Sequence, residues 1–111
     1  MVRRTAPILI RQFDICELPR RGSRQTALVV VLQHDELDSL ATLIVAPLLN
    51  DLPSETHPRL HPKIAIGEHR AFLFVDRMAA VQRSELGLVV GSAAGEAWAI
   101  CRAIDIAFFG F

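Results

Sequence analysis

Short apolar runs alternate with polar segments through most of the chain, and one longer apolar stretch closes it. Two of the runs, residues 26–33 and 42–49, are rich in β-branched side chains and have the length of a strand. Because polar or turn-forming residues bound each of them, both are expected to be core strands. The acidic segment 34–39 is expected to be a turn, and residues 50–62, which contain three prolines, are expected to form a loop.

Four shorter runs in the second half also predict strands. Two of them flank Gly67-Glu68-His69, a connection whose length favours a hairpin. Gly87 lies inside the last run, where a glycine indicates a bulge or a close crossing of two backbones. The four runs are residues 63–66, 70–75, 78–81 and 86–90.

The closing stretch predicts a helix over residues 93–109, which contain no proline. Ser92 can serve as its N-cap. At about 1.5 Å per residue the helix is expected to be roughly 25 Å long. One stripe of apolar residues follows the helical spacing, and further apolar residues lie on other faces. The stripe is Ala97, Cys101, Ile104 and Phe108, and the others are Trp98, Ile100, Ile106 and Phe109.

A helix of this kind has little polar surface beyond Gly95, Arg102 and Asp105. One sheet cannot bury all of its apolar faces. The sequence therefore predicts a homodimer with apolar helices at or near the interface. A helix buried deep in a monomer is the alternative.

Composition narrows the class of protein. The 111 residues predict one domain, and twelve basic against twelve acidic residues give no net charge. Residues 1–24 carry six arginines against Asp14 and Glu17, a local charge of +4. A basic arm of this kind could contact phosphate, but a solvated arm and turn is the favoured interpretation. No apolar run approaches the roughly 20 residues that span a bilayer, so a cytoplasmic protein is expected. Cys16 and Cys101 are expected to be buried, reduced thiols.

The residues that could bind a metal ion or act in catalysis have simpler structural interpretations. His57 and His61 are four residues apart, but Pro58 and Pro62 prevent the helix that would place them on one face. His34 with its acidic neighbours is typical of an exposed turn. Asp76-Arg77 is expected to be an exposed ion pair. We therefore expect no metal site, no cofactor and no catalytic residue.

Several segments, taken in order, resemble one family. They are Gln12-Phe13, Val30-Val31-Leu32-Gln33-His34-Asp35, Pro47-Leu48, His61-Pro62-Lys63-Ile64-Ala65-Ile66-Gly67-Glu68, Met78-Ala79-Ala80-Val81 and Ala103-Ile104-Asp105-Ile106-Ala107-Phe108-Phe109-Gly110-Phe111. With their spacing preserved, they resemble the CcdB family of toxins, which poison DNA gyrase in bacterial toxin–antitoxin modules. The resemblance divides the chain into an N-terminal extension, residues 1–11, and a single toxin domain, residues 12–111.

The resemblance implies a mainly β fold with one α-helix. It comprises a small, strongly bent antiparallel sheet or partly open barrel, a smaller sheet and one C-terminal helix, assembled as a two-fold dimer. It also implies a topoisomerase inhibitor that binds the DNA gyrase A subunit and traps the complex of gyrase with cleaved DNA, and so acts by binding and not as an enzyme. The implied partners are a second copy, gyrase and a CcdA-like antitoxin. Operator DNA would be bound, for repression of transcription, only through the antitoxin complex, and no membrane is involved.

The resemblance also assigns residues. Phe109, Gly110 and Phe111 match the terminal triplet on which gyrase poisoning depends in the family, and Asp105 and Phe108 lie on the adjoining helix face. Leu37 matches another gyrase-facing position. The chain departs from the family at Phe109, where tryptophan is typical, at Phe111, where a smaller aliphatic residue is typical, and at Glu36, which is commonly apolar. Alternatively, Gly110 caps the helix and Phe111 packs back on Ile106.

Two other functions stay open. A messenger-RNA endoribonuclease of the MazF type shares the general architecture, and Arg20, Arg21 and Arg24 could supply its basic groove. The neutral charge and the aromatic tail argue against that interpretation. The third possibility is a non-toxic relative that only binds an antitoxin and regulates its operon.

Overall fold

Strands dominate the molecule, and one helix ends it. The computed structural model describes residues 9–20, 22, 24–37, 39–52 and 59–110. The strands are β1 (Asp14–Pro19), β2 (Thr26–Val31), β3 (Thr42–Leu49), β4 (Lys63–Ile66), β5 (His69–Leu73), β6 (Ala79–Gln82) and β7 (Val89–Ser92), and the helix is α1 (Ala97–Phe109). Short 3₁₀ turns η1 (Asp35–Leu37), η2 (Val75–Arg77), η3 (Arg83–Glu85) and η4 (Ala94–Glu96) connect them.

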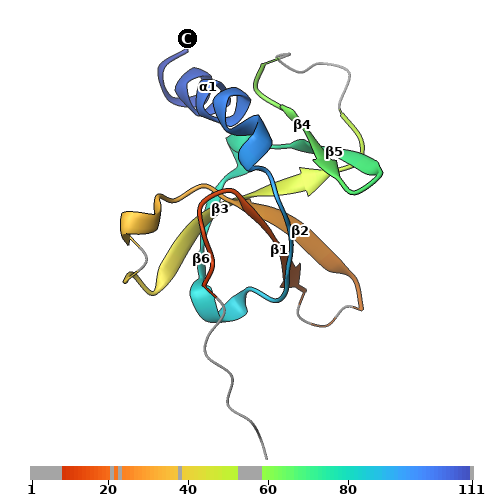
Figure 1. Ribbon diagram of the computed structural model, residues 1–111, viewed down its shortest axis with the longest axis vertical. Coiled ribbons are helices and arrows are strands. Elements are labelled where there is room, and N and C mark those ends of the chain that lie inside the picture. The colour runs from red at the N-terminus through yellow and green to blue at the C-terminus, as the bar shows by residue number, and fades with distance from the viewer. Residues whose placement is uncertain (1–8, 21, 23, 38, 53–58, 111) are drawn as a thin grey trace, which may run out of the picture.

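All pairings in the sheet are antiparallel, and β3 has two partners on one side. Its first half pairs with β6 over residues 42–45, and its last two residues pair with β5. Pro47 lies where the partner changes, a position that tolerates the missing N–H. On its other side β3 pairs with β2, which is followed by β1 and β7. The strands curl into a nearly closed barrel, and the β4–β5 hairpin extends toward α1 (Figure 1).

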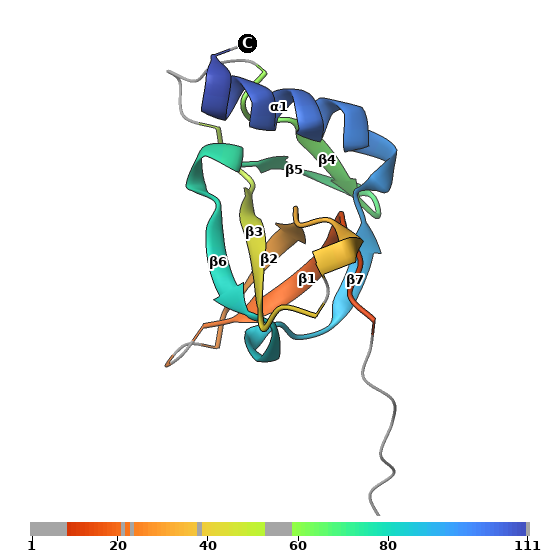
Figure 2. The same cartoon turned by 90° about the vertical axis from the view of Figure 1, so that its left-hand side faces the viewer.

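Parts of β1, β2 and β3 are buried on both faces of the sheet, which explains their continuous apolar runs. In β2, Val30 faces the core that α1 covers, whereas Val29 and Val31 face the interior of the barrel. Ile100 and Ala103 of α1 are fully buried against the first core. Figure 2 shows α1 lying across one end of the molecule, next to the β4–β5 hairpin. The predicted fold class, a mainly β bent sheet or partly open barrel with one C-terminal helix, is confirmed, while the dimer stays a prediction.

The hairpin and the last strand differ in detail from the prediction. The hairpin connection has two residues, because His69 already pairs with Ile66, and Gly67 takes a left-handed φ of 60°. The strand expected over residues 86–90 begins only at Val89. Gly87 lies before it, and its N–H donates to the carbonyl of Glu17 at 2.7 Å. A Cβ at Gly87 would be 3.4 Å from the Glu17 Cβ, so the predicted close crossing of backbones is confirmed.

The helix starts later than predicted. Ser92 belongs to β7, and its Oγ accepts the N–H of Ala94 at 3.1 Å, which begins the 3₁₀ turn η4. Ala93 is fully buried, and its N–H donates to the carbonyl of Phe13 at 2.7 Å. The backbone at Ala93 is therefore held by Phe13, the residue before β1, and is not part of the helix. Thirteen residues remain in α1, a length of roughly 20 Å.

The apolar stripe of the helix coincides only in part with the face that the core covers. Ile100 and Ala103 face the core, whereas Cys101 and Phe108 are exposed. The reason is that apolar residues occupy nearly every face of the helix, so helical spacing alone cannot select the one that the sheet covers. The expected burial holds for Cys16 and is wrong for Cys101.

Candidate functional site

The C-terminal end of α1 presents two aromatic side chains to solvent. Phe108 is 64% exposed and Phe109 is 68% exposed, and their ring centroids lie 6.4 Å apart at an interplanar angle of 51°. The core contacts of Ile100 and Ala103 fix the helix that carries them. Exposed aromatic side chains on a fixed helix are typical of a protein-binding surface.

Gly110 ends the helix in the left-handed conformation, with φ 80°. Its N–H donates to the carbonyl of Ile106 at 2.9 Å. This geometry is the helix cap expected of a glycine, since a side chain at this φ would be strained. The cap turns the backbone away from the helix axis directly after Phe109.

The structure brings together four of the six predicted site residues. Asp105, Phe108, Phe109 and Gly110 all lie on the last turns of α1 and are exposed. Phe111 lies outside the described residues. Leu37, which is 47% exposed, is carried by η1, the orange-yellow coil that both views draw below α1 and away from its C-terminal end (Figures 1 and 2). Leu37 is therefore not part of the α1 surface within one copy of the chain.

A hollow of about 360 Å³ lies between the end of α1 and η2. Phe108 and Ile106 line it from the helix, and Asp76 and Met78 line it from the other side. Asp76 also approaches His61, whose Nε2 lies 2.9 Å from its Oδ1. Because a carboxylate only accepts, the ring donates from Nε2.

The His61–Asp76 pair was not anticipated from the sequence. The His61 ring is buried against Phe74, with centroids 4.3 Å apart, while its Nδ1 is buried without a hydrogen-bond partner among the described residues. The predicted Asp76–Arg77 ion pair is wrong, because the Arg77 guanidinium stacks instead on Phe74, 4.8 Å from the ring centroid. His61 is thus a packing residue that ties the chain before β4 to η2.

No group of three potential metal ligands occurs among the described residues. His57, the other half of the candidate pair, lies outside them. Burial, followed by the charge of Asp14, raises the pKa of the Cys16 thiol to about 11. Cys16 is consequently a neutral, unreactive thiol at physiological pH.

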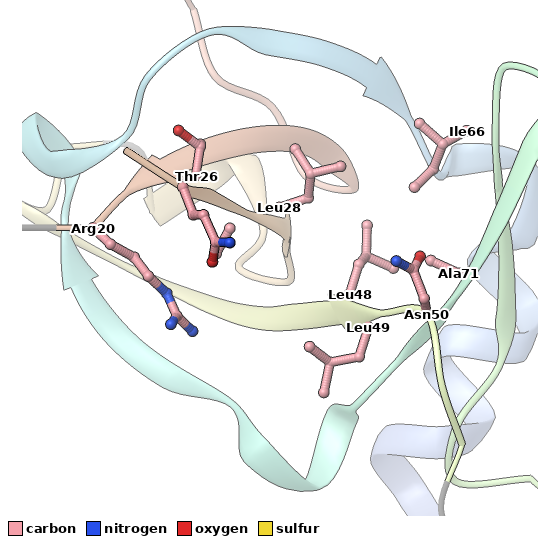
Figure 3. Close-up of a pocket in the computed structure, with 10 residues that line it drawn as sticks. Arg20, Thr26, Leu28, Leu48, Leu49, Asn50, Ile66 and Ala71 are labelled. Atoms are coloured by element: carbon pink, nitrogen blue, oxygen red, sulfur yellow. The ribbon is translucent and has the colours of Figure 1, made fainter. Parts of the chain in front are cut away.

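A second candidate surface is a cleft between the start of β2 and the end of β3 (Figure 3). Its volume is about 370 Å³. Arg20 lies toward one end and Asn50 toward the other, with Leu28 and Leu48 between them. Thr26 adds a hydroxyl. Of the described residues that line the cleft, none carries a carboxylate or an imidazole.

Comparisons with solved structures show which known proteins share this fold. An endoribonuclease in complex with its cognate antitoxin, from Mycobacterial species, has a TM-score of 0.73 and 12% identity, covering 92% of this chain and 94% of its own. The Mycobacterium tuberculosis toxin MazF-mt6 has a TM-score of 0.69 and 17% identity, covering 86% and 95%. A MazE–MazF complex from Deinococcus radiodurans has a TM-score of 0.70 and 10% identity, covering 89% and 94%. This chain therefore shares its fold with these endoribonuclease and MazF structures.

The family itself is shown by sequence. Residues 12–110 match the family model described as CcdB protein. The chain belongs to the CcdB family and is a toxin of the toxin–antitoxin class, which confirms the resemblance. No curated protein matches the sequence at a significant level.

These comparisons also correct one expectation. The prediction that the protein is not an enzyme, which came from the family resemblance, is contradicted, because solved structures that share the fold include endoribonucleases. The expected architectural similarity to the MazF type is confirmed. Within the described residues, no helix is long and apolar enough to cross a membrane.

Proposed function

We propose that the protein is a toxin that binds the DNA gyrase A subunit through the end of α1 and traps gyrase on cleaved DNA. The observation that carries the proposal is the pair of exposed rings, Phe108 and Phe109, on the last turn of a helix that lies inside the family match. An aromatic anchor of this kind commonly contributes about 2 kcal/mol or more to binding. Asp105 adds an exposed carboxylate one turn before them.

The geometry supports this role because the rings are already in place. Burial of Ile100 and Ala103 fixes the helix, so little ordering cost is left for the binding step. Gly110 ends the helix directly after Phe109, so both rings stay at its exposed end. Leu37 would contribute from a separate position.

The proposal includes two partners. We infer that the active form is a homodimer, in which a second copy covers part of the apolar surface left exposed, and that an antitoxin neutralises the toxin in the cell. The solved neighbours that include cognate antitoxins support the second inference. Joint repression of transcription with that antitoxin would follow the family.

Growth of bacteria after induction of the chain tests the proposal. Induction should arrest growth, and a double variant, Phe108→Ala with Phe109→Ala, should abolish the arrest. The control is Leu88→Ala, which removes an equally exposed apolar side chain just before β7 and should leave the arrest intact. Arrest that survives the double variant in folded protein would overturn the assignment of α1.

RNA cleavage in the Arg20 cleft is the second candidate function. The fold shared with endoribonucleases favours it, and Arg20, Thr26 and Asn50 line a cleft able to hold a phosphodiester. In that reaction a 2′-hydroxyl would lose its proton to water and attack the phosphorus, and the bond from phosphorus to the 5′-oxygen of the next nucleotide would break, with that oxygen taking a proton from water. Arg20 would stabilise the negative charge that develops on the phosphate oxygens. Cleavage of RNA by purified protein that is lost in Arg20→Ala, and that is indifferent to the α1 variants, would select this function over gyrase binding.

A further inference from the structure

A groove that neither function uses lies between the first half of α1 and the chain just before β4. Its volume is about 410 Å³. Its lining residues are Arg59, Pro62, Trp98, Ala99 and Arg102. The groove is separate from the hollow beside Phe108, which Leu60 and η2 line.

Both walls of the groove are fixed by contacts elsewhere. On one side, Ile100 and Ala103 anchor α1 in the core. On the other, the carbonyl of Pro62 accepts the N–H of Leu73 at 2.9 Å, and the neighbouring His61 is bound to Asp76. A ligand would therefore meet a preformed groove, which lowers the ordering cost of binding.

Trp98 is the main apolar feature of the groove. It is 76% exposed, more than any other exposed large hydrophobic residue in the part of the chain that the structure describes. The guanidinium carbon of Arg102 lies 5.5 Å from the centroid of its ring, which holds the two side chains together. Tryptophan and arginine are the residue types most enriched among the energetic anchors of interfaces.

The charge of the lining selects the partner. Two of the lining residues are arginines, and none of the described lining residues is acidic, although the chain as a whole carries no net charge. A guanidinium binds a carboxylate through two parallel hydrogen bonds. Pro62, Ala99 and the Trp98 ring leave room for an apolar side chain beside that carboxylate.

We propose that this groove binds an acidic peptide segment that carries an apolar side chain, with a carboxylate on Arg102 and the apolar side chain against Trp98 and Pro62. This proposal rests on the antitoxin partner proposed above and identifies its docking segment as acidic. A peptide is favoured over RNA because most of the lining is not charged, and binding of a polyanion would require an extended basic surface.

The test uses the full-length chain and a short synthetic peptide of alternating glutamate and leucine. Trp98 is the only tryptophan in the chain, so its fluorescence reports on the groove directly. Saturable quenching or shift of the emission is expected, and titration of a fluorescein-labelled copy of the peptide gives the Kd. Arg102→Glu and Trp98→Ala should each weaken binding at least about tenfold, whereas Trp98→Phe should retain most of it.

Arg70→Glu is the matched control, since it makes the same charge change on the exposed face of β5 and should leave the Kd unchanged. Because Trp98 is exposed, its variants should keep the thermal midpoint of the parent. The Phe108→Ala and Phe109→Ala double variant should bind the peptide normally, so failure of the gyrase proposal would not affect this result.

Three outcomes would overturn the inference. One is the absence of saturable binding. Another is failure of a specificity control, meaning that the parent and both groove variants bind equally or that a peptide with lysine in place of glutamate binds equally. The third is displacement of the peptide by a single-stranded RNA oligonucleotide that itself binds in a manner dependent on Trp98.

Discussion

The carbonyl of Phe13 accepts the N–H of Ala93 at 2.7 Å, and this bond joins the entry of β1 to the segment that leads into α1. The N–H of Phe13 donates at the same distance to Val31 of β2. Phe13 makes both bonds with φ at 71°, the only positive φ of a non-glycine residue among those described. The position of the helix therefore depends on a strained backbone, which its partly buried ring helps to hold.

The strain at Phe13 gives an unusual order of stabilities. Phe13→Ala removes the ring from the core and keeps the strained φ, so it should lower the free energy of unfolding by about 2 kcal/mol or more. Phe13→Gly also removes the ring but tolerates the φ, and should be more stable than the alanine variant by about 1 kcal/mol. Chemical denaturation measures both. A glycine variant less stable than the alanine variant would contradict the strain argument.

The His61–Asp76 contact should stabilise the protein through a buried donor. His61→Ala removes both the hydrogen bond and the packing on Phe74, and should cost about 2–4 kcal/mol of unfolding free energy. Asp76→Ala leaves the His61 Nε2 donor unsatisfied and should cost about 1–3 kcal/mol. Asp105→Ala, an exposed carboxylate on α1, is the control and should change the unfolding free energy by less than about 0.5 kcal/mol.

The two cysteines should differ sharply in reactivity. At pH 8, alkylation should modify exposed Cys101 quickly and buried Cys16 only on unfolding, because burial raises the pKa of Cys16 to about 11. Mass spectrometry of the alkylated peptides measures both rates. Fast modification of Cys16 in the folded protein would contradict the burial of its thiol.

The raised pKa of Cys16 also makes the free energy of unfolding depend on pH. The unfolded thiol loses its proton near its ordinary pKa of 9.0, whereas the folded thiol keeps it up to about 11. The folded state therefore binds more protons in this range, and stability should fall as pH rises from about 9 toward 11. Cys16→Ala should remove this part of the slope in denaturation curves recorded across that range.

The predictions from sequence succeeded where local pattern decides the structure. The expected strand over residues 42–49 matches β3 at both ends, because its apolar run is buried and its boundaries are polar. The start of α1 was missed because Phe13, distant in sequence, takes the N–H of Ala93. No local signal at Ala93 reports that bond.

The candidate site also contains some features that the local sequence predicts and others that depend on tertiary contacts. Phe108, Phe109 and Gly110 could be placed from the tail alone, since the helix and its glycine cap are local features. The His61–Asp76 pair depends on how two chain segments fold back on each other, and the groove at Trp98 depends on which helix face the core covers. Neither follows from spacing along the sequence.

Trapping of cleaved DNA by purified gyrase is the most direct test of the central claim, that the end of α1 acts on gyrase. The parent protein should accumulate linear, gyrase-linked DNA from a supercoiled plasmid, as Leu88→Ala should, whereas the Phe108→Ala and Phe109→Ala double variant should lose the effect. The absence of cleaved DNA with folded parent protein, or equal trapping by the double variant, would contradict the account.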